Sequence, residues 1–585
     1  MAGPSEPNAA FYFNPENYQT SGDGVVGRQS ATGGFLRGFI QHGGTDRFFI
    51  YADSANVFEE FQRFAVDAGA RADQAAAFLP VTTAHLKQLG TVFRPGPDLG
   101  DLAWRRRHFD QRDFSICGIT HTVSETMAMQ VIGNLMIAPV QHWDALVCTT
   151  ECVKGVIERL LADWADYLGA RFEHDVQLPC RLPVIPLGVD SAAMAAKADD
   201  SYARATLRET LGIKDGDIAL LYAGRLNHVE KANPIPMYLA AEAAAANTGV
   251  RLHLIQAGQA TNAEVENAFK QAAAAFAPKV NHHFIDGSRD DHYDKAWAAA
   301  DIFISLSDNI QESFGLTPIE AMAAGLPVVI SNYNGYRESV RDGVEGLTVP
   351  SAQPAPGAGA EMAFLYDSGF VPYPVFTAAI SQSTAVDVPA AAEALSRLIE
   401  NGDLRARLGA AGQQRAGSVY DWRHVVRAHQ ELWTELTNVR THGKENVPPF
   451  PGKAPFPLAP DPFGPFLAHA TGLLDANTTL LADGPFDEEA FQALYRSDIA
   501  TPLSAVLLDE ADTTNLLKRI INAGAMSAGD ATKYMAQEKI TPLYLTLGWL
   551  AKVGLIAVTA TPINAASRID GPFGRSETWR KLGSG

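Results

Sequence analysis

The chain has 585 residues, of which 46% are hydrophobic and 19% are charged, and its formal net charge at pH 7 is −19. This composition excludes a disordered tail and leaves room for roughly three or four globular domains. The acidic balance argues against nucleic acid as a partner, because neutralising phosphates needs clustered Lys and Arg side chains.

The amino terminus lacks a basic segment followed by an apolar one, and no apolar span is long enough to cross a bilayer. We therefore expect a cytoplasmic protein without a transmembrane segment, with any contact at the inner membrane face being peripheral. The cysteines lack a second Cys or His pair at the spacing of zinc ligands. We expect buried, reduced thiols at Cys117, Cys148, Cys152 and Cys180, and no metal site.

The first predicted domain covers residues 1–189, where short apolar runs alternate with amphipathic stretches. This alternation is typical of a parallel sheet covered by helices. The expected strands are Ala10–Phe13, Arg47–Tyr51, Phe114–Thr120, Ala145–Thr149 and Leu182–Pro186.

The same alternation restarts at Ile218 and predicts a second doubly wound domain over residues 190–438. Prolines, glycines and aromatic residues within 351–385 predict an irregular insertion in this domain. Two such domains in series leave a cleft at the carboxyl ends of their strands. The expected strands are Ile218–Ala223, Leu252–Ala257, His283–Ile285, Ile302–Leu306 and Val328–Ser331.

The second domain opens with a strand that ends at Gly224, which permits a tight turn. Arg225 and Lys231 follow on the next loop. A guanidinium fork and an ammonium at this spacing could bracket a diphosphate. The alternative is that both side chains are ordinary solvated surface cations.

A segment from Glu312 to Glu320 places two carboxylates around a predicted helix start. Thr317 and Glu320 fit a capping box with proline at the first helical position, and Gly315 lies just before it. Unpaired N–H groups at such a helix start attract phosphate. The alternative is a capping glutamate at Glu320 and a solvated loop residue at Glu312.

Together, these motifs resemble, in order and spacing, the nucleotide-sugar half of retaining glycosyltransferases of the GT-B fold, family 4 (glycosyl transferases group 1). The likeness covers about residues 182–433. It implies an α/β GT-B fold, in which two Rossmann-like doubly wound domains face a cleft. The motifs are Tyr222-Ala-Gly-Arg225 with Lys231, Gln256-Ala-Gly258, Ala300-Asp301-Ile-Phe-Ile-Ser-Leu306, Glu312 to Val329, and Gly343-Val-Glu-Gly346-Leu.

The resemblance assigns roles to positions on both domains. It implies that Arg225 and Lys231 stabilise the diphosphate leaving group, that Glu312 contacts the donor sugar, and that Glu320 holds the ribose. His121, after a predicted strand, resembles the family's histidine at the reacting centre, and a turn or core residue is the alternative. The implied catalytic residues are His121, Glu312, Arg225 and Lys231. The implied donor-binding residues are Gly33, Gly34, Gly224, Arg225, Lys231, Ser313, Phe314, Gly315, Leu316, Thr317 and Glu320.

Gly33 and Gly34 precede a helical pattern at Phe35 and look like the family's first-domain glycine loop; a flexible surface turn is the alternative. Asp144 to Thr150 and Ile185 to Asp190 also look like family landmarks that serve packing and the crossover between domains.

The resemblance implies transfer of a sugar from a nucleotide-diphosphate sugar to a glycan, lipid or protein acceptor, with retained anomeric configuration and without a metal or other cofactor. A glycoside phosphorylase or a sucrose- or trehalose-type synthase on the same fold is a second hypothesis. A non-catalytic sugar-nucleotide-binding scaffold is the third.

A proline-rich linker over 439–465 and a carboxyl-terminal module over 466–585 complete the chain. Helical patterns at Thr513–Ala523, Ser527–Gln537 and Thr541–Val553, followed by a strand-like Ala557–Thr561, predict a small, mainly helical, winged-helix-like unit. Its acidic residues outnumber its basic ones, so we expect it to dock a protein partner or form a homo-oligomer rather than read DNA. A passive helical appendage is the alternative.

Overall fold

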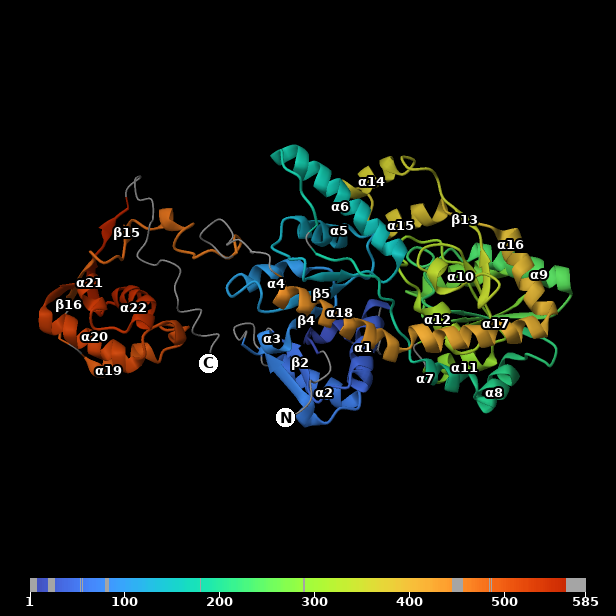
Figure 1. The fold of residues 1–585 in the computed structure, drawn as a ribbon, viewed down its shortest axis with the longest axis horizontal. Helices are drawn as coiled ribbons and strands as arrows, with labels where there is room; N and C mark the ends of the chain where they lie inside the picture. The colour runs from blue at the N-terminus through green and yellow to red at the C-terminus, as the bar shows by residue number, and fades with distance from the viewer. Residues whose placement is uncertain are drawn as a thin grey trace. The chain divides into compact units, whose positions relative to one another are not determined.

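The computed structural model describes residues 8–18, 27–52, 54, 56–78, 84–178, 180–287, 290–443, 456–482, 484–485 and 487–563. The chain divides into two compact units. Unit 1 comprises Met1–Arg106 and Asp110–Asn446, and unit 2 comprises Arg107–Phe109 and Val447–Gly585. Unit 1 contains two lobes, each built on one sheet (Figure 1). No helix in the described part of the chain is both long and apolar enough to span a bilayer.

The first lobe is built on six parallel strands in the order β3-β2-β1-β4-β5-β6. Four of the five expected strands are confirmed, whereas Leu182–Pro186 makes only an isolated bridge at Val184. The strands β3 and β4 were not predicted. The strands are β1 Ala10–Tyr12, β2 Phe48–Tyr51, β3 Ala75–Phe78, β4 Thr91–Arg94, β5 Ser115–Ile119 and β6 Ala145–Val147.

The helices of this lobe include one that corrects a sequence prediction. Gly33 and Gly34 lie inside α1 rather than in a loop before a helix. A Cβ atom on Gly34 would lie 2.8 Å from the ring of Trp422, so the small residue lets α18 approach α1 closely. The helices are α1 Gly27–His42, α2 Asn56–Asp67, α3 Ala84–Leu89, α4 Leu99–Arg106, α5 Thr126–Gly133 and α6 Glu151–Phe172.

A fully buried ion pair lies within the first lobe. Arg106 donates to both carboxylate oxygens of Asp144 at 2.8 and 2.7 Å, and both side chains are inaccessible to solvent. Asp144 also accepts from the amides of Ile116 and Gln141. These bonds tie α4 to the β5 and β6 edge of the sheet, which fits the packing role expected for Asp144.

The second lobe is built on six parallel strands in the order β12-β11-β10-β7-β8-β9. All five expected strands are confirmed within one or two residues at each end, and β12 was not predicted. The strands are β7 Ile218–Ala223, β8 Leu252–Ala257, β9 Asn281–Ile285, β10 Ile302–Ser305, β11 Val328–Ser331 and β12 Gly346–Val349. Between residues 191 and 442, apart from the segment 351–385, the helices are α7 Ser191–Ala198, α8 Ser201–Leu211, α9 Ile235–Thr248, α10 Ala263–Phe276, α11 Asp290–Ala299, α12 Leu316–Ala323, α13 Tyr336–Ser339, α16 Val388–Glu400, α17 Gly402–Arg415 and α18 Trp422–His442.

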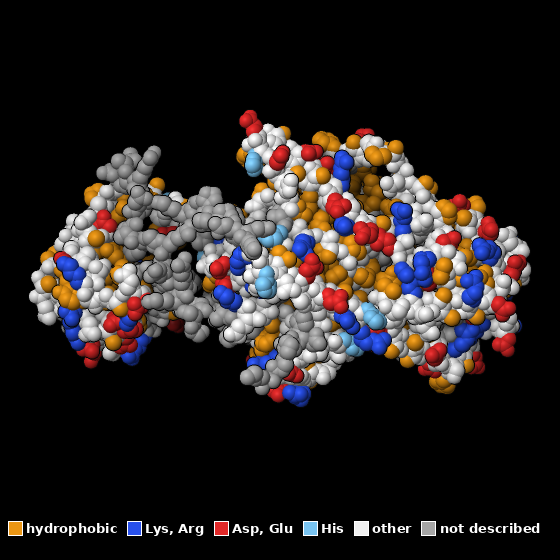
Figure 2. Space-filling view, in the orientation of Figure 1, with side chains coloured by type: hydrophobic (Ala, Val, Ile, Leu, Met, Phe, Trp, Pro, Cys, Tyr) orange, Lys and Arg blue, Asp and Glu red, His pale blue; other side chains and the backbone are white. Residues whose placement is uncertain are grey.

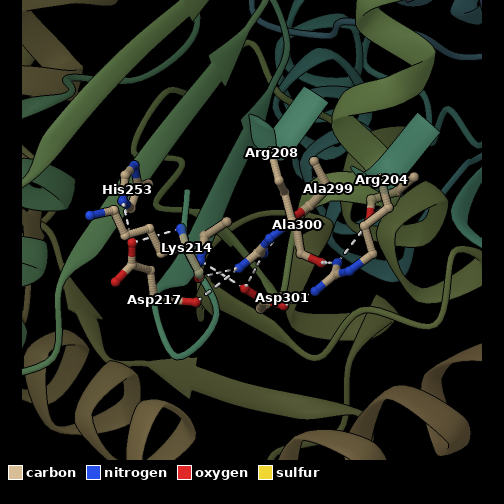
Figure 3. A network of polar contacts seen from close by, with 10 residues as sticks. Arg204, Arg208, Lys214, Asp217, His253, Ala299, Ala300 and Asp301 are labelled. Carbon is tan, nitrogen blue, oxygen red and sulfur yellow. Dashed lines mark hydrogen bonds and ion pairs between the residues drawn. The ribbon is translucent and has the colours of Figure 1, made fainter. Parts of the chain in front are cut away.

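A charged network clamps α8 to the amino edge of this sheet (Figure 3). Asp301, just before β10, accepts from Arg204 at 2.7 Å, from Arg208 at 3.0 Å and from the amide of Ala219 at 2.8 Å. The Asp301 side chain is only 15% exposed. Asp301, which belongs to one of the family-like motifs, therefore joins α8 to the amino edge of the sheet. The expected site lies at the opposite, carboxyl edge.

The segment 351–385 is not irregular as expected, because it forms two helices and a short antiparallel ribbon. The ribbon pairs β13 Ser351–Ala352 with β14 Ala385–Val386, and between them lie α14 Ala360–Asp367 and α15 Tyr373–Gln382. Pro372 precedes α15 as its N-cap, a place where proline does not interrupt a helix.

The last long helix of unit 1, α18, packs on the first lobe although it follows the second in sequence. It lies against α1 and β5, and in Figure 1 it appears in orange among the blue elements. Trp433 on α18 meets the ring of Phe11 on β1 edge-on at 6.2 Å. The chain thus crosses between the lobes twice. Where the two crossings meet, the Val189 amide donates to the Tyr420 carbonyl and the Trp422 amide donates to the Val189 carbonyl.

Unit 2 is a small α/β unit with a three-stranded antiparallel sheet in the order β17-β16-β18. The helix expected over Ser527–Gln537 is shorter, because residues 525–527 form a strand and the helix ends at Thr532. Of the expected linker, 439–442 belong to α18, and 444–455 lie outside the described residues. The winged-helix assignment stays a prediction. The elements are β15 Gly472–Leu473, β16 Thr479–Ala482, α19 Glu488–Tyr495, α20 Glu510–Ala523, β17 Ala525–Ser527, α21 Ala528–Thr532, α22 Ile540–Lys552, β18 Ile556–Thr559 and β19 Thr561–Pro562.

Candidate functional site

Three loops of the second lobe meet closely at the carboxyl edge of its sheet. Gly224 follows β7 with φ of 141°, a conformation that favours glycine. A Cβ atom on Gly258, which follows β8, would lie 1.7 Å from the carbonyl oxygen of Gly224. One on Gly287, which follows β9, would lie 2.9 Å from Gly258. Glycine after each strand therefore lets the backbone turns pack against one another.

The loop after Gly224 is folded around Asn227, whose Oδ1 accepts from the amides of Val229 and Glu230 at 2.9 Å. This local turn presents both predicted cations. Arg225 Nη1 lies 3.2 Å from Glu230 Oε2, and Lys231 Nζ lies 3.0 Å from Glu312 Oε2. The Arg225 and Lys231 side chains are about 30% exposed, so a ligand can reach them.

The Glu312 to Glu320 segment does begin a helix, but not through the expected capping box. The N-cap of α12 is Gly315, with φ of 86°, and no side chain caps the helix. Thr317 is the second residue of α12 and Glu320 is the fifth, so neither occupies its capping-box position. A Cβ atom on Gly315 would lie 2.0 Å from the ring of Tyr336, which explains the glycine.

The other predicted residues of this segment have distinct surroundings. Phe314 is buried, at 4% exposure, and meets Tyr420 edge-on. The carbonyl of Ser313 accepts from Thr150 Oγ1 of the first lobe at 3.2 Å. Leu316 is the first helical residue, where an amide N–H has no partner within the helix.

The pKa of Glu320 is unusually high for a glutamate. Burial raises its pKa to about 7, and the nearby Lys197 opposes that shift. A carboxylate with this pKa is ionised only partly at neutral pH. Its ability to accept hydrogen bonds from a ligand therefore depends on pH in the physiological range.

His121 follows β5 in the first lobe. It lines a small cavity together with Phe35, Phe93, Trp422 and His429. The structure therefore brings Arg225, Lys231 and Glu312 together in the second lobe and places His121, like Gly33 and Gly34, in the first.

Two polar residues that the sequence analysis missed support the charged loops. Asn309 Nδ2 donates to the carbonyl of Val229 at 2.9 Å, and the Asn309 carbonyl accepts from the amide of Glu312. Asp308 accepts from Ser381 Oγ at 2.7 Å, and burial raises the pKa of Asp308 to about 6. Both lie on the loop that follows β10, which ends at Ser305. Open α/β sheets bind ligands at the carboxyl ends of their strands. Two successive polar residues soon after a buried strand were therefore a signal in the sequence that could have identified Asp308 and Asn309.

Cys117, Cys148 and Cys180 are buried, Cys152 is partly buried, and all four are free thiols. Among the described residues, no group of three or more His, Cys, Asp or Glu side chains is arranged to hold a metal ion.

Comparison with known proteins finds a match to a family model over part of the second lobe, a part that includes Arg225, Lys231, Glu312 and Glu320. Residues 203–362 match the family model described as "Glycosyl transferases group 1". A D-inositol 3-phosphate glycosyltransferase of Geodermatophilus obscurus is 32% identical over 251 residues, which are 42% of this chain and 54% of that protein. A protein of the same name from Mycolicibacterium gilvum is 30% identical over 214 residues, covering 34% of this chain and 45% of that one. The chain thus spans about half the length of the relatives it matches.

The solved structures that match this chain are more distant in sequence. Anabaena Alr3699/HepE in complex with UDP is 15% identical, covers 73% of this chain and 100% of that one, and has a TM-score of 0.45. Sucrose-phosphate synthase from Thermosynechococcus elongatus is 16% identical, covers 74% of this chain and 99% of that one, and also has a TM-score of 0.45.

Proposed function

We propose that this chain is a GT-B glycosyltransferase that moves a sugar from a nucleotide-diphosphate sugar to an acceptor, with retention of anomeric configuration. One observation carries the proposal: the Lys231–Glu312 ion pair lies at the carboxyl edge of the second sheet, with Arg225 on the same loop. The match of residues 203–362 to group 1 glycosyl transferases supports it.

The two ion pairs suggest how a donor would enter. A diphosphate carries more negative charge than a carboxylate and would draw Lys231 away from Glu312 and Arg225 away from Glu230. The freed Glu312 carboxylate would then accept hydrogen bonds from sugar hydroxyls. Donor binding would thus exchange ion pairs within the protein for ion pairs with the ligand.

During transfer, the bond between the anomeric carbon and the diphosphate oxygen breaks, and negative charge develops on the departing oxygens. Lys231 and Arg225 would stabilise that charge, together with the N–H groups at the start of α12. We propose that Lys231, Arg225 and these N–H groups act without a metal ion. We also propose that Glu320 holds the ribose and that His121 lies at the acceptor side.

The proposal is tested by incubating the protein with UDP-, GDP- and ADP-sugars and measuring slow donor hydrolysis and protection against thermal unfolding, with and without EDTA. We expect one base to raise the melting temperature and to release nucleoside diphosphate, with no loss of rate in EDTA. No response to any nucleotide sugar, together with release of sugar 1-phosphate from an oligosaccharide in the presence of inorganic phosphate, would indicate a glycoside phosphorylase instead. Binding without any turnover would indicate a scaffold.

A further inference from the structure

The buried face of α15 is polar rather than apolar. The buried residues of this helix are Thr377 and Ser381, four positions apart and therefore on one face, with exposures of 0% and 2%. Large apolar residues of the same insertion are instead exposed: Phe364 at 67% and Phe370 at 83%. Figure 2 shows hydrophobic side chains around α14 and α15 beside a hollow. Apolar burial therefore does not explain why α15 docks where it does.

The two buried hydroxyls contact the loops of the candidate donor site. Thr377 Oγ1 lies 3.2 Å from the carbonyl oxygen of Val229 and 3.0 Å from that of Pro374, so its one proton is shared between them. Asn309 donates to the same Val229 carbonyl at 2.9 Å. Val229 lies two residues before Lys231, and the bonds from Thr377 and Asn309 fix the backbone that presents this cation.

The second hydroxyl reinforces the same contact. Ser381 Oγ donates to Asp308 Oδ1 at 2.7 Å, and Asp308 also accepts from the amide of Asn233, just beyond the cation loop. Buried polar groups are costly when they lose a partner, so this face of α15 has one favoured docking position.

The other end of the insertion reaches the first lobe. Tyr373 Oη lies 2.7 Å from Ser124 Oγ, and the amide of Thr126 donates to Tyr366 Oη at 3.4 Å. Ser124 lies three residues after His121 on the loop that follows β5. One helix therefore contacts both the loop with Lys231 and the loop with His121.

We infer that α15 is a positioning element: through Thr377 it fixes the Arg225–Lys231 loop, and through Tyr373 it fixes the loop that carries His121, so that donor and acceptor sides keep a common geometry. This inference rests on the proposed function. Displacements of about 1 Å in such loops are enough to slow a group transfer strongly.

The donor-side contact is tested with Thr377→Val, which keeps the shape and removes the hydroxyl. The measurement is hydrolysis of whichever UDP-, GDP- or ADP-sugar the wild-type protein cleaves. We expect kcat to fall about fivefold, as loss of a single hydrogen bond predicts, while KM for the donor changes less than twofold. Thr377→Ser should restore the rate. Ser383→Ala, an exposed change at the end of the same helix, is the matched control.

The first-lobe contact is tested by a double-mutant cycle of Ser124→Ala and Tyr373→Phe, which remove the two ends of one hydrogen bond. Each single variant and the double variant should show the same decrease in kcat with an unchanged melting temperature. Additive decreases in kcat across the cycle would overturn the inference. Rates within twofold of wild type for Thr377→Val and for all three variants of the cycle would overturn it as well. Wild-type protein that neither binds nor cleaves any of these donors would instead defeat the proposed function.

Discussion

Lys231 Nζ and Glu312 Oε2 lie 3.0 Å apart although the two residues are separated by 81 positions in the chain. Each belongs to a loop that follows a buried parallel strand, β7 for Lys231 and β10 for Glu312. Since β7 and β10 are neighbours in the sheet, their carboxyl ends bring the two loops together. The ion pair is a consequence of strand order.

Replacing Lys231 by Ala should separate catalysis from stability. We expect kcat for donor cleavage to fall about 100-fold, the effect of removing one group that stabilises developing charge. The free energy of unfolding should change by less than about 1 kcal/mol, because the Lys231–Glu312 pair is partly exposed. Steady-state kinetics and thermal unfolding measure both. Lys270→Ala, at the exposed Lys270–Glu266 pair, is the control, and a fully active Lys231→Ala would contradict the proposed role.

Glu320 should make donor affinity depend on pH. Burial raises its pKa to about 7, so the side chain is neutral below pH 7 and ionised above it. The carboxylate accepts hydrogen bonds from two ribose hydroxyls more strongly than the neutral acid does. We therefore expect KM for the donor to rise as pH falls from 8 to 6.

Glu320→Gln is the control for this titration, because the amide cannot ionise. Its KM should be higher than that of wild type at pH 8 and independent of pH. The Glu320→Gln variant should lose no stability at pH 8. Because the pKa of Glu320 is higher in the folded than in the unfolded protein, ionising this side chain lowers the free energy of unfolding at every pH above the unfolded pKa. This loss grows until the pH exceeds about 7. A wild-type KM that stays constant from pH 6 to 8 would rule out this role.

Gly315→Ala should damage the site locally. The backbone of Gly315 is left-handed, and an added Cβ would lie 2.0 Å from Tyr336. We expect the start of α12 to shift and the donor-induced rise in melting temperature to disappear. Gly343→Ala has a similar positive φ but open space around the added Cβ, so it isolates backbone strain from the clash. Equal behaviour of the two variants would contradict the steric argument.

The strands of both lobes were largely predictable from the sequence because their buried apolar runs are a local signal. The exceptions are informative. Residues 75–78 read Ala-Ala-Ala-Phe, which favours a helix by propensity, and only pairing with β2 makes them a strand. Gly33 and Gly34 resemble the family's first-domain glycine loop, yet both lie inside α1, and at Gly34 a distant partner, Trp422, leaves no room for a side chain.

The charged groups of the site were predictable by type but not by contact. Arg225, Lys231 and Glu312 were identified from motifs, whereas their ion pairs depend on strand order and loop conformation. Asn309 and Thr377 were missed because their role depends on one backbone carbonyl, that of Val229, which no side-chain pattern reveals. The capping-box prediction was wrong because Gly315, rather than Thr317, is the N-cap of α12. The helix therefore starts two residues earlier than predicted.

Unit 2 gives a prediction about assembly. A chain that ends after Pro460 keeps Arg225, Lys231, Glu312 and all the strands of unit 1. We therefore expect it to retain the donor-induced rise in melting temperature and the rate of donor cleavage. Light scattering should show a lower oligomeric state than the full chain if unit 2 carries a self-association surface.

The structure offers side chains for such a surface on unit 2, since Ile499 and Leu503 are 95% and 60% exposed. A full-length Ile499→Asp, Leu503→Asp variant should reproduce the oligomeric state of the truncated chain while leaving donor cleavage unchanged. Ser497→Asp, in the same segment but at a polar position, controls for added charge. If the full chain, the truncated chain and the double variant have the same mass in solution and capture the same partners, unit 2 is a passive appendage.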